Sequence, residues 1–499
     1  MWMDILKKAM LPSAHNLENP DRPEDKMWTF EECSKYYLCL EGDVFEFKCT
    51  QGLLFDINRQ LCDTQQNVHN CDITFETLIP KPLLENALCK NESYLGCADG
   101  SCIPADYFCD GSNDCADSSD EGWCEMNDDP NAAAPCDEGL CKLPVCFCSS
   151  TGTKIPGNLE TTQVPQMITL TFSGSINHEN WDLYTRQLFT PERRNPNGCE
   201  IRGTFFVSHP YTNYRHVQKI WNDGHEIAVN SITNRGPEEW WARNSTIEEW
   251  FDEMVGQANI INRFANVRME DFRGLRVPFL SVGWNRQFLM MNEFGFEYDS
   301  TIVAPMSPLP YWPYTLDYMM PHSCTAKNQN CPTRSYPSLW EIVINPLKFG
   351  DELCSTLSNC TSGHTSDKVY EMLMNNFKRH YLTNRAPFGV HLDSKWLKRH
   401  DNLDGFKRFI DEMLKLQEVY FVTNNQVIEW MRHPIPVNNV GKFTPWQCKQ
   451  EYFEPSEIAC LQPNTCKLST KTLEHDRYMI TCNECPRSYP WLRNEFGYD

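Results

Sequence analysis

The sequence predicts a multidomain protein in which two small disulfide-rich modules precede one large α/β domain and a cysteine-bearing tail. Three observations predict this arrangement. At about 150 residues per domain, 499 residues make about three domains. The 25 cysteines gather toward the two ends of the chain, which indicates a disulfide framework made in an oxidising compartment. Between them, from Met167 to about His433, short apolar runs alternate with amphipathic stretches.

Composition excludes several classes of partner. The chain has 45 Lys and Arg against 67 Asp and Glu, a net charge of -22, which opposes binding to nucleic acid or to an anionic membrane surface. No apolar run approaches the roughly 18 residues of a membrane span. The first residues, MWMDILKKAM, contain neither the apolar core nor the cleavage site of a signal peptide. Secretion is therefore predicted from the cysteines alone, and the N-terminus is expected to be truncated or processed.

Residues 17–72 are predicted to form the first module. Its strand-like runs KYYLCL and VFEFKC offer too small a core to fold without disulfides. The phrases CSKYYLC and GLLFDINRQLC resemble the peritrophin-A type chitin-binding domain. The family's first cysteine is absent near Leu17, which leaves Cys39 without its partner and accounts for the odd total. The resemblance implies two disulfides, Cys33–Cys71 and Cys49–Cys62.

Four aromatic residues of this module are candidates for contact with chitin. N-acetylglucosamine presents an apolar ring face and an acetamide group, so a site for it needs exposed aromatic side chains and a few amide partners. The alternative is that about half of the four form the small core of the module. The candidates are Tyr36, Tyr37, Phe47 and Phe55.

The second module, over residues 88–125, ends in the acidic phrase CDGSNDCADSSDE, which resembles the closing phrase of a low-density-lipoprotein-receptor class A repeat. The resemblance implies a structural calcium ion, because calcium takes six to eight oxygen ligands and such a module has little core of its own. It assigns carboxylate ligands to Asp110, Asp114, Asp120 and Glu121, and backbone carbonyl ligands to Tyr107 and Ser112. It also implies the disulfides Cys89–Cys102, Cys97–Cys115 and Cys109–Cys124.

After a cysteine-bearing linker over 126–164, the large domain is predicted over 165–435 and the tail over 436–499. Strands that alternate with helices predict parallel βα units, in a barrel or a doubly wound sheet. The clearest helix is expected over Thr246–Val267, beginning with a capping box of Ser245 and Glu248. The tail cysteines are expected to fix the tail to the large domain. The predicted strands are MITLTF, GTFFVS, HEIAVN, FRGLRVP, FGVHL and VYFVT.

Phrases along the large domain resemble animal chitin deacetylases, among them VPQMITLTF, NPNGCEIRGTFFVSHPYTNY and GHEIAVNSITN, and so does YPWL in the tail. The resemblance implies a distorted (β/α) barrel of the polysaccharide deacetylase type with a disulfide-pinned C-terminal tail. In that family a zinc-like ion, held by one Asp and two His, activates water against an N-acetyl group. A second Asp acts as base, and a His on a late strand acts as acid.

The chain lacks the groups that this chemistry needs. Where the family has T-F-D-D, it has Ser173 and Gly174 as the last two residues; where the family has H-S-x-x-H, it has Asn230 and Asn234. Asparagine offers only a neutral oxygen and glycine offers no ligand, so no zinc is expected in the barrel. The acid aligns with Asp393, although His391, two residues earlier, can face the same side of a strand. Arg276 and Pro278 keep part of the R-x-P-Y motif.

These observations favour a secreted, chitin-binding pseudoenzyme of the extracellular matrix, for example a cuticle, with chitin or its oligomers as partner. Two alternatives stay open. One is an active chitin deacetylase, an amide hydrolase, whose rearranged site uses His391 and Asp393. The other is a matrix adaptor whose class A repeat binds an extracellular protein. Ser173 as the nucleophile of a serine hydrolase has little support, because the sequence contains no nucleophile turn around it.

Overall fold

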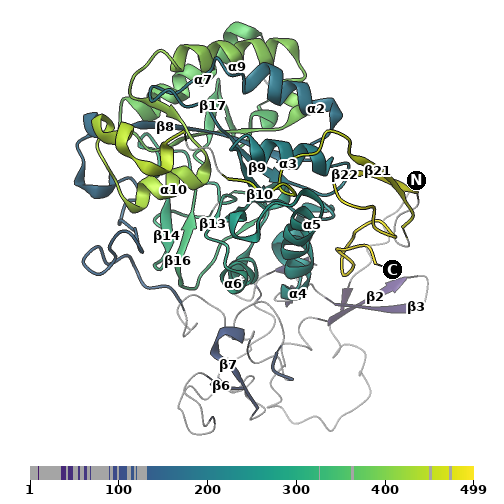
Figure 1. Cartoon of the computed structure of the whole chain (residues 1–499). Coiled ribbons are helices and arrows are strands. Elements are labelled where there is room, and N and C mark those ends of the chain that lie inside the picture. Colours follow the sequence, from purple (N-terminus) through teal and green to yellow (C-terminus); the bar gives the residue numbers. More distant parts are fainter. Residues whose placement is uncertain are drawn as a thin grey trace, which may run out of the picture. The chain divides into compact units, whose positions relative to one another are not determined.

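The structure is a computed structural model that describes residues 68, 89, 94–97, 101–108, 114–116, 120, 132–324, 326–360, 365–448, 452–470 and 475–498. For residues 9–10, 35–40, 43–48, 54–56 and 61–63 it describes the backbone strands alone. The chain divides into two compact units, Met1–Cys102 and Ile103–Asp499 (Figure 1). No helix among the described residues combines the length and the apolar character needed to cross a membrane.

The first unit contains the β-strands predicted for the first module. β2 (Lys35–Leu40) pairs antiparallel with β3 (Asp43–Lys48), which confirms the two predicted runs, and β1 (Ala9–Met10) pairs with β2. A second pair is formed by β4 (Leu54–Asp56) and β5 (Leu61–Asp63). Of the cysteines in the two disulfides predicted here, Cys33, Cys49 and Cys71 lie outside the described residues.

One nine-stranded sheet organises the large domain. Its path is β14-β16-β13-β11-β10-β9-β8-β19, and β20 also pairs with β8. Every pair is parallel except β14 with β16, and no pairing between β14 and β19 closes the path among the described residues. The predicted α/β domain is therefore confirmed, with one antiparallel edge strand. The strands are β8 (Gln166–Gly174), β9 (Thr204–Val207), β10 (Glu226–Val229), β11 (Gly274–Leu275), β13 (Tyr298–Asp299), β14 (Tyr314–Leu316), β16 (Tyr336–Glu341), β19 (Phe388–Leu392) and β20 (Val419–Phe421).

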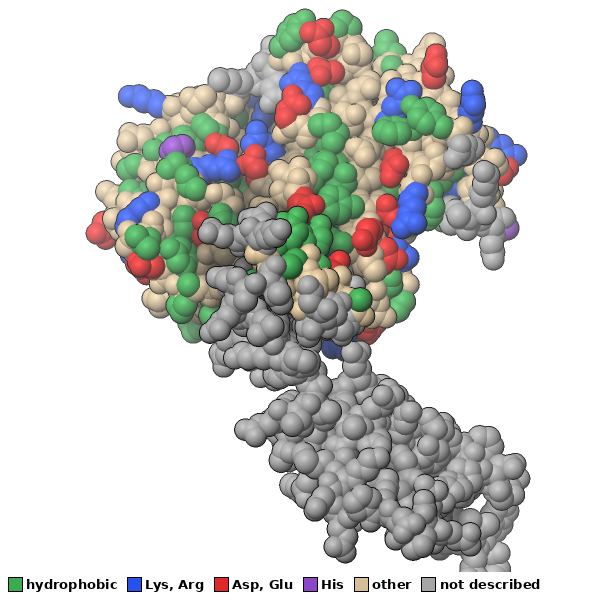
Figure 2. Space-filling view, turned by 90° about the horizontal axis from the view of Figure 1, so that it is seen from below, with side chains coloured by type: hydrophobic (Ala, Val, Ile, Leu, Met, Phe, Trp, Pro, Cys, Tyr) green, Lys and Arg blue, Asp and Glu red, His purple; other side chains and the backbone are tan. Residues whose placement is uncertain are grey.

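Helices lie around the outside of these strands (Figure 1). The face seen in the space-filling view carries hydrophobic, basic and acidic side chains interspersed with one another (Figure 2). α7 packs against α9, and α3 packs against α5. Shorter pairs of strands, β12 (Val282–Gly283) with β15 (Gln329–Asn330) and β17 (Leu347–Phe349) with β18 (Glu352–Cys354), lie outside the main sheet. The helices are α2 (His178–Asp182), α3 (Tyr214–Asn222), α4 (Ile247–Trp250), α5 (Gly256–Ala265), α6 (Trp284–Phe294), α7 (Ser366–Tyr381), α8 (Ser394–Leu397), α9 (His400–Met413) and α10 (Asn424–Arg432).

The helix expected over Thr246–Val267 begins one residue later than predicted. Thr246 is its N-cap and accepts a hydrogen bond from the backbone N–H of Glu249, whose side chain accepts from the Thr246 N–H. The capping box predicted for Ser245 and Glu248 is therefore wrong by one position, because the buried Ser245 hydroxyl instead donates to the Trp241 carbonyl. A π-helical turn, Phe251–Val255, separates α4 from α5.

The inner face of β8 changes character along the strand. Its outer face, with Ile168, Leu170 and Phe172, joins the main apolar core beneath the helices. On the inner face Met167 belongs to a second apolar cluster, whereas Thr169, Thr171 and Ser173 follow it at intervals of two residues. Polar side chains therefore gather where β8 ends.

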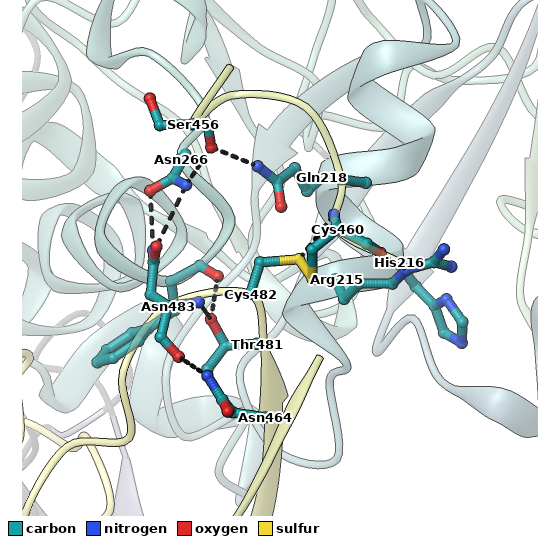
Figure 3. Close-up of a disulfide and its surroundings, with 12 residues drawn as sticks. Arg215, His216, Gln218, Asn266, Ser456, Cys460, Asn464, Thr481, Cys482 and Asn483 are labelled. Carbon is teal, nitrogen blue, oxygen red and sulfur yellow. Dashed lines mark hydrogen bonds between the residues drawn. A yellow bond between two sulfur atoms is a disulfide. The ribbon is translucent and has the colours of Figure 1, made fainter. Parts of the chain in front are cut away.

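The C-terminal tail is fixed to the large domain, as predicted. Cys448 pairs with Cys199, and the two tail strands β21 (Asn464–Leu468) and β22 (Arg477–Thr481) are held by Cys460–Cys482 and Cys466–Cys485. Figure 3 shows the Cys460–Cys482 bridge beside α3 and α5. There Arg215 Nε donates to the Cys460 carbonyl at 3.0 Å, and Asn266 Nδ2 donates to the Ser456 carbonyl at 2.6 Å.

All fourteen cysteines from Cys136 onward are paired. The odd cysteine of the chain therefore belongs to the N-terminal modules, in agreement with the missing partner predicted for Cys39. The remaining bridges of this part of the chain are Cys136–Cys148, Cys141–Cys146, Cys324–Cys331 and Cys354–Cys360.

Candidate active site and binding modules

Arg276 forms the floor of the candidate active site, directly after β11. Its guanidinium is only 2% exposed and lies 4.2 Å from the centre of the Phe206 ring. Nε donates to the Ser300 carbonyl at 2.7 Å, Nη2 to Ser300 Oγ at 2.9 Å, and Nη1 to Thr171 Oγ1 at 2.8 Å. The buried Pro278 begins the turn that follows. Arg276 thus ties β8, β11 and the segment after β13 together.

His391, on β19, is held in a neutral form by this floor. Its Nδ1 lies 2.8 Å from Thr171 Oγ1 and 3.0 Å from Arg276 Nη2. Because a guanidinium can only donate, Nδ1 accepts, and the ring proton is on Nε2. Burial, and then the Arg276 charge, lower the pKa of His391 well below its usual range. A general acid must carry an additional proton, so an imidazole in this setting is poorly suited to the role.

Asp393, the other residue at the predicted acid position, serves as a helix cap. One carboxylate oxygen accepts from the backbone N–H of Trp396 at 2.8 Å, at the start of α8. The Ser358 hydroxyl donates to the other oxygen. Both oxygens of this carboxylate therefore have structural partners.

Ser173 and Gly174 end β8 beside this floor. The Ser173 hydroxyl lies 3.5 Å from Arg276 Nη1, at the limit of a hydrogen bond, and no histidine is among the contacts described for it. Gly174 has φ of +118°, and a Cβ atom placed on it would meet no atom within 4 Å. The space at the end of β8 is therefore open, but the backbone conformation at Gly174 favours glycine.

Asn230 and Asn234 lie on the far side of β9 from Ser173. The Asn230 side chain is 3% exposed, and its Nδ2 donates to the Arg276 carbonyl at 2.8 Å. Asn234 has a left-handed backbone, with φ of +47°, and its N–H donates to Ser231 Oγ at 2.9 Å. Its backbone is thus set by a turn.

These side chains do not fit a zinc ion. Zinc takes thiolate, imidazole or carboxylate ligands, whereas the positions that the resemblance assigns to it hold one glycine and two amides. Within the ranges that the structure describes, no three His, Cys, Asp or Glu side chains are grouped to hold a metal. The donor set at the end of β8 and after β10 is therefore that of a polar floor and differs from that of a zinc centre.

Two buried acids that the sequence did not reveal lie behind the floor. Asp299 on β13 and Glu341 on β16 are both fully buried. Burial raises the pKa of Asp299 to about 6, and burial and the neighbouring Asp299 charge raise the pKa of Glu341 well above its usual range. Asp299 Oδ1 accepts from Gln287 Nε2 at 3.0 Å and from Thr301 Oγ1 at 2.6 Å. Neither acid was predicted from the sequence, because β13 has only two residues and β16 contains no continuous apolar run.

Replacing Glu341 with Gln is expected to stabilise the protein increasingly as pH rises. The folded chain keeps the Glu341 proton to higher pH than the unfolded chain does, so wild-type stability falls as pH rises above the unfolded pKa of about 4.3. Glutamine cannot ionise. The difference in unfolding free energy between E341Q and wild type should grow by about 1 to 3 kcal/mol between pH 5 and pH 8 in urea titrations.

Glu412→Gln supplies the control, because Glu412 is a surface residue paired with Lys415. Its effect should change little over the same pH range. A difference between E341Q and wild type that is equal at both pH values would contradict the raised pKa.

Part of the second module is described, and it suits a calcium ion. The Asp114 N–H donates to Asp120 Oδ2 at 2.6 Å, and Asp120 is 1% exposed. Burial and the Asp120 charge raise the pKa of Asp114, an effect that a bound cation would oppose. Tyr107 lies in a short 3₁₀ turn that follows strand β7 (Cys102–Pro104). The remaining predicted ligands, Asp110, Ser112 and Glu121, lie outside the described residues.

The disulfides of this module are described in part. The predicted bridge Cys89–Cys102 is confirmed. Cys97, directly after β6 (Tyr94–Gly96), and Cys115 are each disulfide-bonded, and their pairing with one another stays a prediction. Cys109 and Cys124 lie outside the described residues.

Comparison with known proteins identifies both small modules. The chitin-binding peritrophin-A domain matches residues 20–71, and the low-density lipoprotein receptor domain class A matches residues 87–124. Chitin deacetylase 1 of Bombyx mori is 43% identical over 482 residues, which cover 94% of this chain and 88% of that protein. Chitin deacetylase 8 of the same organism is 36% identical over 374 residues, covering 73% of this chain and 94% of that protein.

Solved structures match at lower similarity. Puue allantoinase has a TM-score of 0.37 at 16% identity and covers 56% of this chain and 94% of its own. The catalytic domain of a peptidoglycan N-acetylglucosamine deacetylase from Eubacterium rectale has a TM-score of 0.30 at 13% identity and covers 55% and 93%.

Proposed function

Because this chain belongs to the chitin deacetylase family, with a chitin-binding peritrophin-A domain and a class A repeat before its deacetylase-like domain, we propose that it is an extracellular chitin-binding member without deacetylase activity. One observation carries this proposal. The positions that would supply the base and the metal ligands hold a hydroxyl, a glycine and two amides, and the groups that remain have structural partners.

Loss of activity in this proposal has a chemical basis. Without imidazole or carboxylate at Gly174, Asn230 and Asn234, the domain has no means of making a hydroxide nucleophile at neutral pH. Without a carboxylate at position 173, no base is in place there. The rearranged alternative would need His391 as an acid and Asp393 as a free carboxylate. The first is neutral and bonded through Nδ1, and the second caps α8.

Calcium has a structural role in this proposal. The backbone N–H of Asp114 and the buried carboxylate of Asp120 already form one loop closure, and the ion would neutralise the acids around it. The ion would then keep the second module folded.

Chitin contact is proposed for one face of the β2–β3 ribbon. Tyr36 lies opposite Phe47 in the register, and Leu38 lies opposite Phe45, so these four positions share an apolar face. Tyr37 lies on the other face, opposite Glu46 and next to positions Lys35 and Lys48. The apolar face suits the small core of the module. Tyr37 is therefore the aromatic residue of this ribbon that we assign to the sugar ring.

Tyr37→Ala is expected to weaken binding of the full-length protein to chitin at least about 30-fold, since removing a central aromatic contact costs about 2 kcal/mol or more. Tyr36→Ala should instead lower the melting temperature of the first module. Affinity is measured by pull-down on chitin beads, and zinc is measured by elemental analysis in the same preparation.

The control for this experiment is Tyr37→Phe, which keeps the ring and should bind within a few-fold of wild type. Chitin binding that survives Tyr37→Ala would contradict the assignment of this face. About one equivalent of zinc in the wild-type preparation would contradict the proposed loss of the metal site.

A further inference from the structure

Three asparagines of the chain stand in the N-x-S/T triplet that accepts an N-linked glycan, namely Asn91, Asn244 and Asn359. The many disulfides indicate folding in the oxidising secretory compartment, where such glycans are added. A triplet alone is a weak signal, because it occurs often by chance. The surroundings of Asn244 and Asn359 differ in the folded chain, whereas Asn91 lies outside the described residues.

Asn244 presents an unbonded side-chain amide at the surface. It is exposed as the last residue of the π-helical turn Trp240–Asn244, and its side chain makes no hydrogen bond with the residues that the structure describes. The buried Arg286 holds the backbone on both sides of it, since Nη1 donates to the Ser245 carbonyl at 2.8 Å and to the Arg243 carbonyl at 3.2 Å. A glycan on Nδ2 would therefore replace water and disturb no contact of the fold.

Asn359 is exposed as well, but a disulfide locks the triplet around it. The middle residue, Cys360, is 2% exposed and is bonded to Cys354, six residues earlier. The triplet begins in the 3₁₀ turn Leu357–Asn359, and the Cys360 N–H donates to the Leu357 carbonyl at 3.2 Å. A glycosyltransferase must take the triplet into its active site as a flexible segment, so this triplet can react only before the bridge closes.

Closure of the bridge thus competes with modification of Asn359. Cys354 and Cys360 are close in sequence, so bringing them together costs little loop-closure entropy. No such closure restrains Asn244, because the cysteines nearest to it along the chain are Cys199 and Cys324. Its triplet therefore stays open to the transferase for longer.

We propose that the fold selects Asn244 as the principal N-glycosylation site of the large domain and leaves Asn359 mostly unmodified. In the reaction, Nδ2 of Asn244 attacks C1 of a lipid-diphosphate-linked oligosaccharide. The N–C1 bond forms, the C1–O bond to the diphosphate breaks, and Nδ2 loses one proton, so nothing is oxidised or reduced. This inference rests on the extracellular location in the proposed function, and it is independent of the catalytic state of the domain.

The test is expression of the full-length chain in insect cells, with a secretory leader added. Enzymatic release of N-glycans in water enriched in the heavy oxygen isotope turns each modified asparagine into a labelled aspartate, and peptide mass spectrometry then gives its occupancy. Asn244 is expected to be modified in most secreted molecules and Asn359 in a minority. An unmodified Asn244, or an Asn359 modified as fully as Asn244, would overturn the proposal.

Three variants test the site at Asn244. Asn244→Gln and Thr246→Ala should each remove one glycan, whereas Thr246→Ser keeps both the triplet and the N-cap of α4 and should retain it. Produced in bacteria without glycans, Asn244→Gln should melt as wild type does, and Thr246→Ala should melt lower because the cap is lost. Loss of stability in Asn244→Gln would contradict the absence of structural contacts of this side chain.

The effect of the bridge is tested by Cys354→Ser, which keeps the triplet at Asn359 but prevents its closure. Occupancy of Asn359, measured on intracellular and secreted protein together, should then approach that of Asn244. The control is Cys324→Ser, which opens another short bridge, Cys324–Cys331, and should leave Asn359 unchanged. Equal occupancy of Asn359 in wild type and Cys354→Ser would overturn selection by the bridge.

Failure of this inference differs from failure of the proposed function. A secreted, inactive protein without a glycan at Asn244 would overturn only the modification site. Zinc-dependent release of acetate from chitin would overturn the proposed function, whatever the occupancy of Asn244.

Discussion

Purified protein is expected to release acetate from chitin oligomers at least about 10⁴-fold more slowly than an active chitin deacetylase, with no stimulation by added zinc or cobalt. Catalytic zinc lowers the pKa of its bound water from about 15.7 to about 7, which is worth at most about 12 kcal/mol in generating the nucleophile. Free hydroxide is more reactive than zinc-bound hydroxide, so the true loss is smaller. Half of that limit still corresponds to more than four orders of magnitude in rate.

The matched control returns the metal ligands. In Gly174→Asp/Asn230→His/Asn234→His, three positions on β8 and just after β10 regain one carboxylate and two imidazoles, and zinc content should rise toward one equivalent. The backbone at position 174 opposes this gain in zinc binding, because its φ of +118° is costly for any residue except glycine. Zinc-stimulated release of acetate by the wild-type chain would contradict the prediction, because it would show that other residues hold the ion.

Local signals in the sequence located most of the large domain. The runs around Met167, Phe205, Ile227 and Val390 are continuous and apolar, as strands buried on both faces are, and they form β8, β9, β10 and β19 of the sheet. The strand at Tyr336–Glu341 gave no such signal, because two exposed residues, Pro337 and Ser338, interrupt it. Asp299 and Glu341 were missed with these strands, since burial of an acid depends on neighbours that are remote in sequence.

The same limit applies to the candidate site. In the structure Ser173 and Gly174 end β8, and Asn230 directly follows β10, with β9 between these two strands. Resemblance of short phrases could not show that His391 accepts from Arg276 or that Asp393 caps α8, because each contact depends on side-chain direction as well as on sequence position.

Removal of the bridge that closes the large domain is expected to destabilise the protein more than removal of any other bridge among the described residues. Cys199 and Cys448 are separated by 249 residues and join the segment before β9 to the start of the tail. Cross-linking so distant a pair restricts the unfolded chain, and loop-closure entropy assigns about 5 kcal/mol to it. The double variant Cys199→Ala/Cys448→Ala should lose about that much unfolding free energy in urea titrations without reductant.

Loop length explains this size, and a second bridge tests the explanation. Cys324 and Cys331 are only 7 residues apart, so Cys324→Ala/Cys331→Ala should cost about 2 kcal/mol by the same relation. Equal losses in the two double variants would mean that local packing around each bridge, and not restriction of the unfolded chain, sets its contribution. The Cys199–Cys448 variant should also loosen the tail first, because the covalent link there is lost and only noncovalent contacts remain, among them Asn197 Nδ2 donating to the Trp446 carbonyl at 2.8 Å and Trp446 Nε1 donating to the Gln426 carbonyl at 2.9 Å. Earlier proteolysis within the tail than within α7 or α9 would therefore accompany the loss of stability.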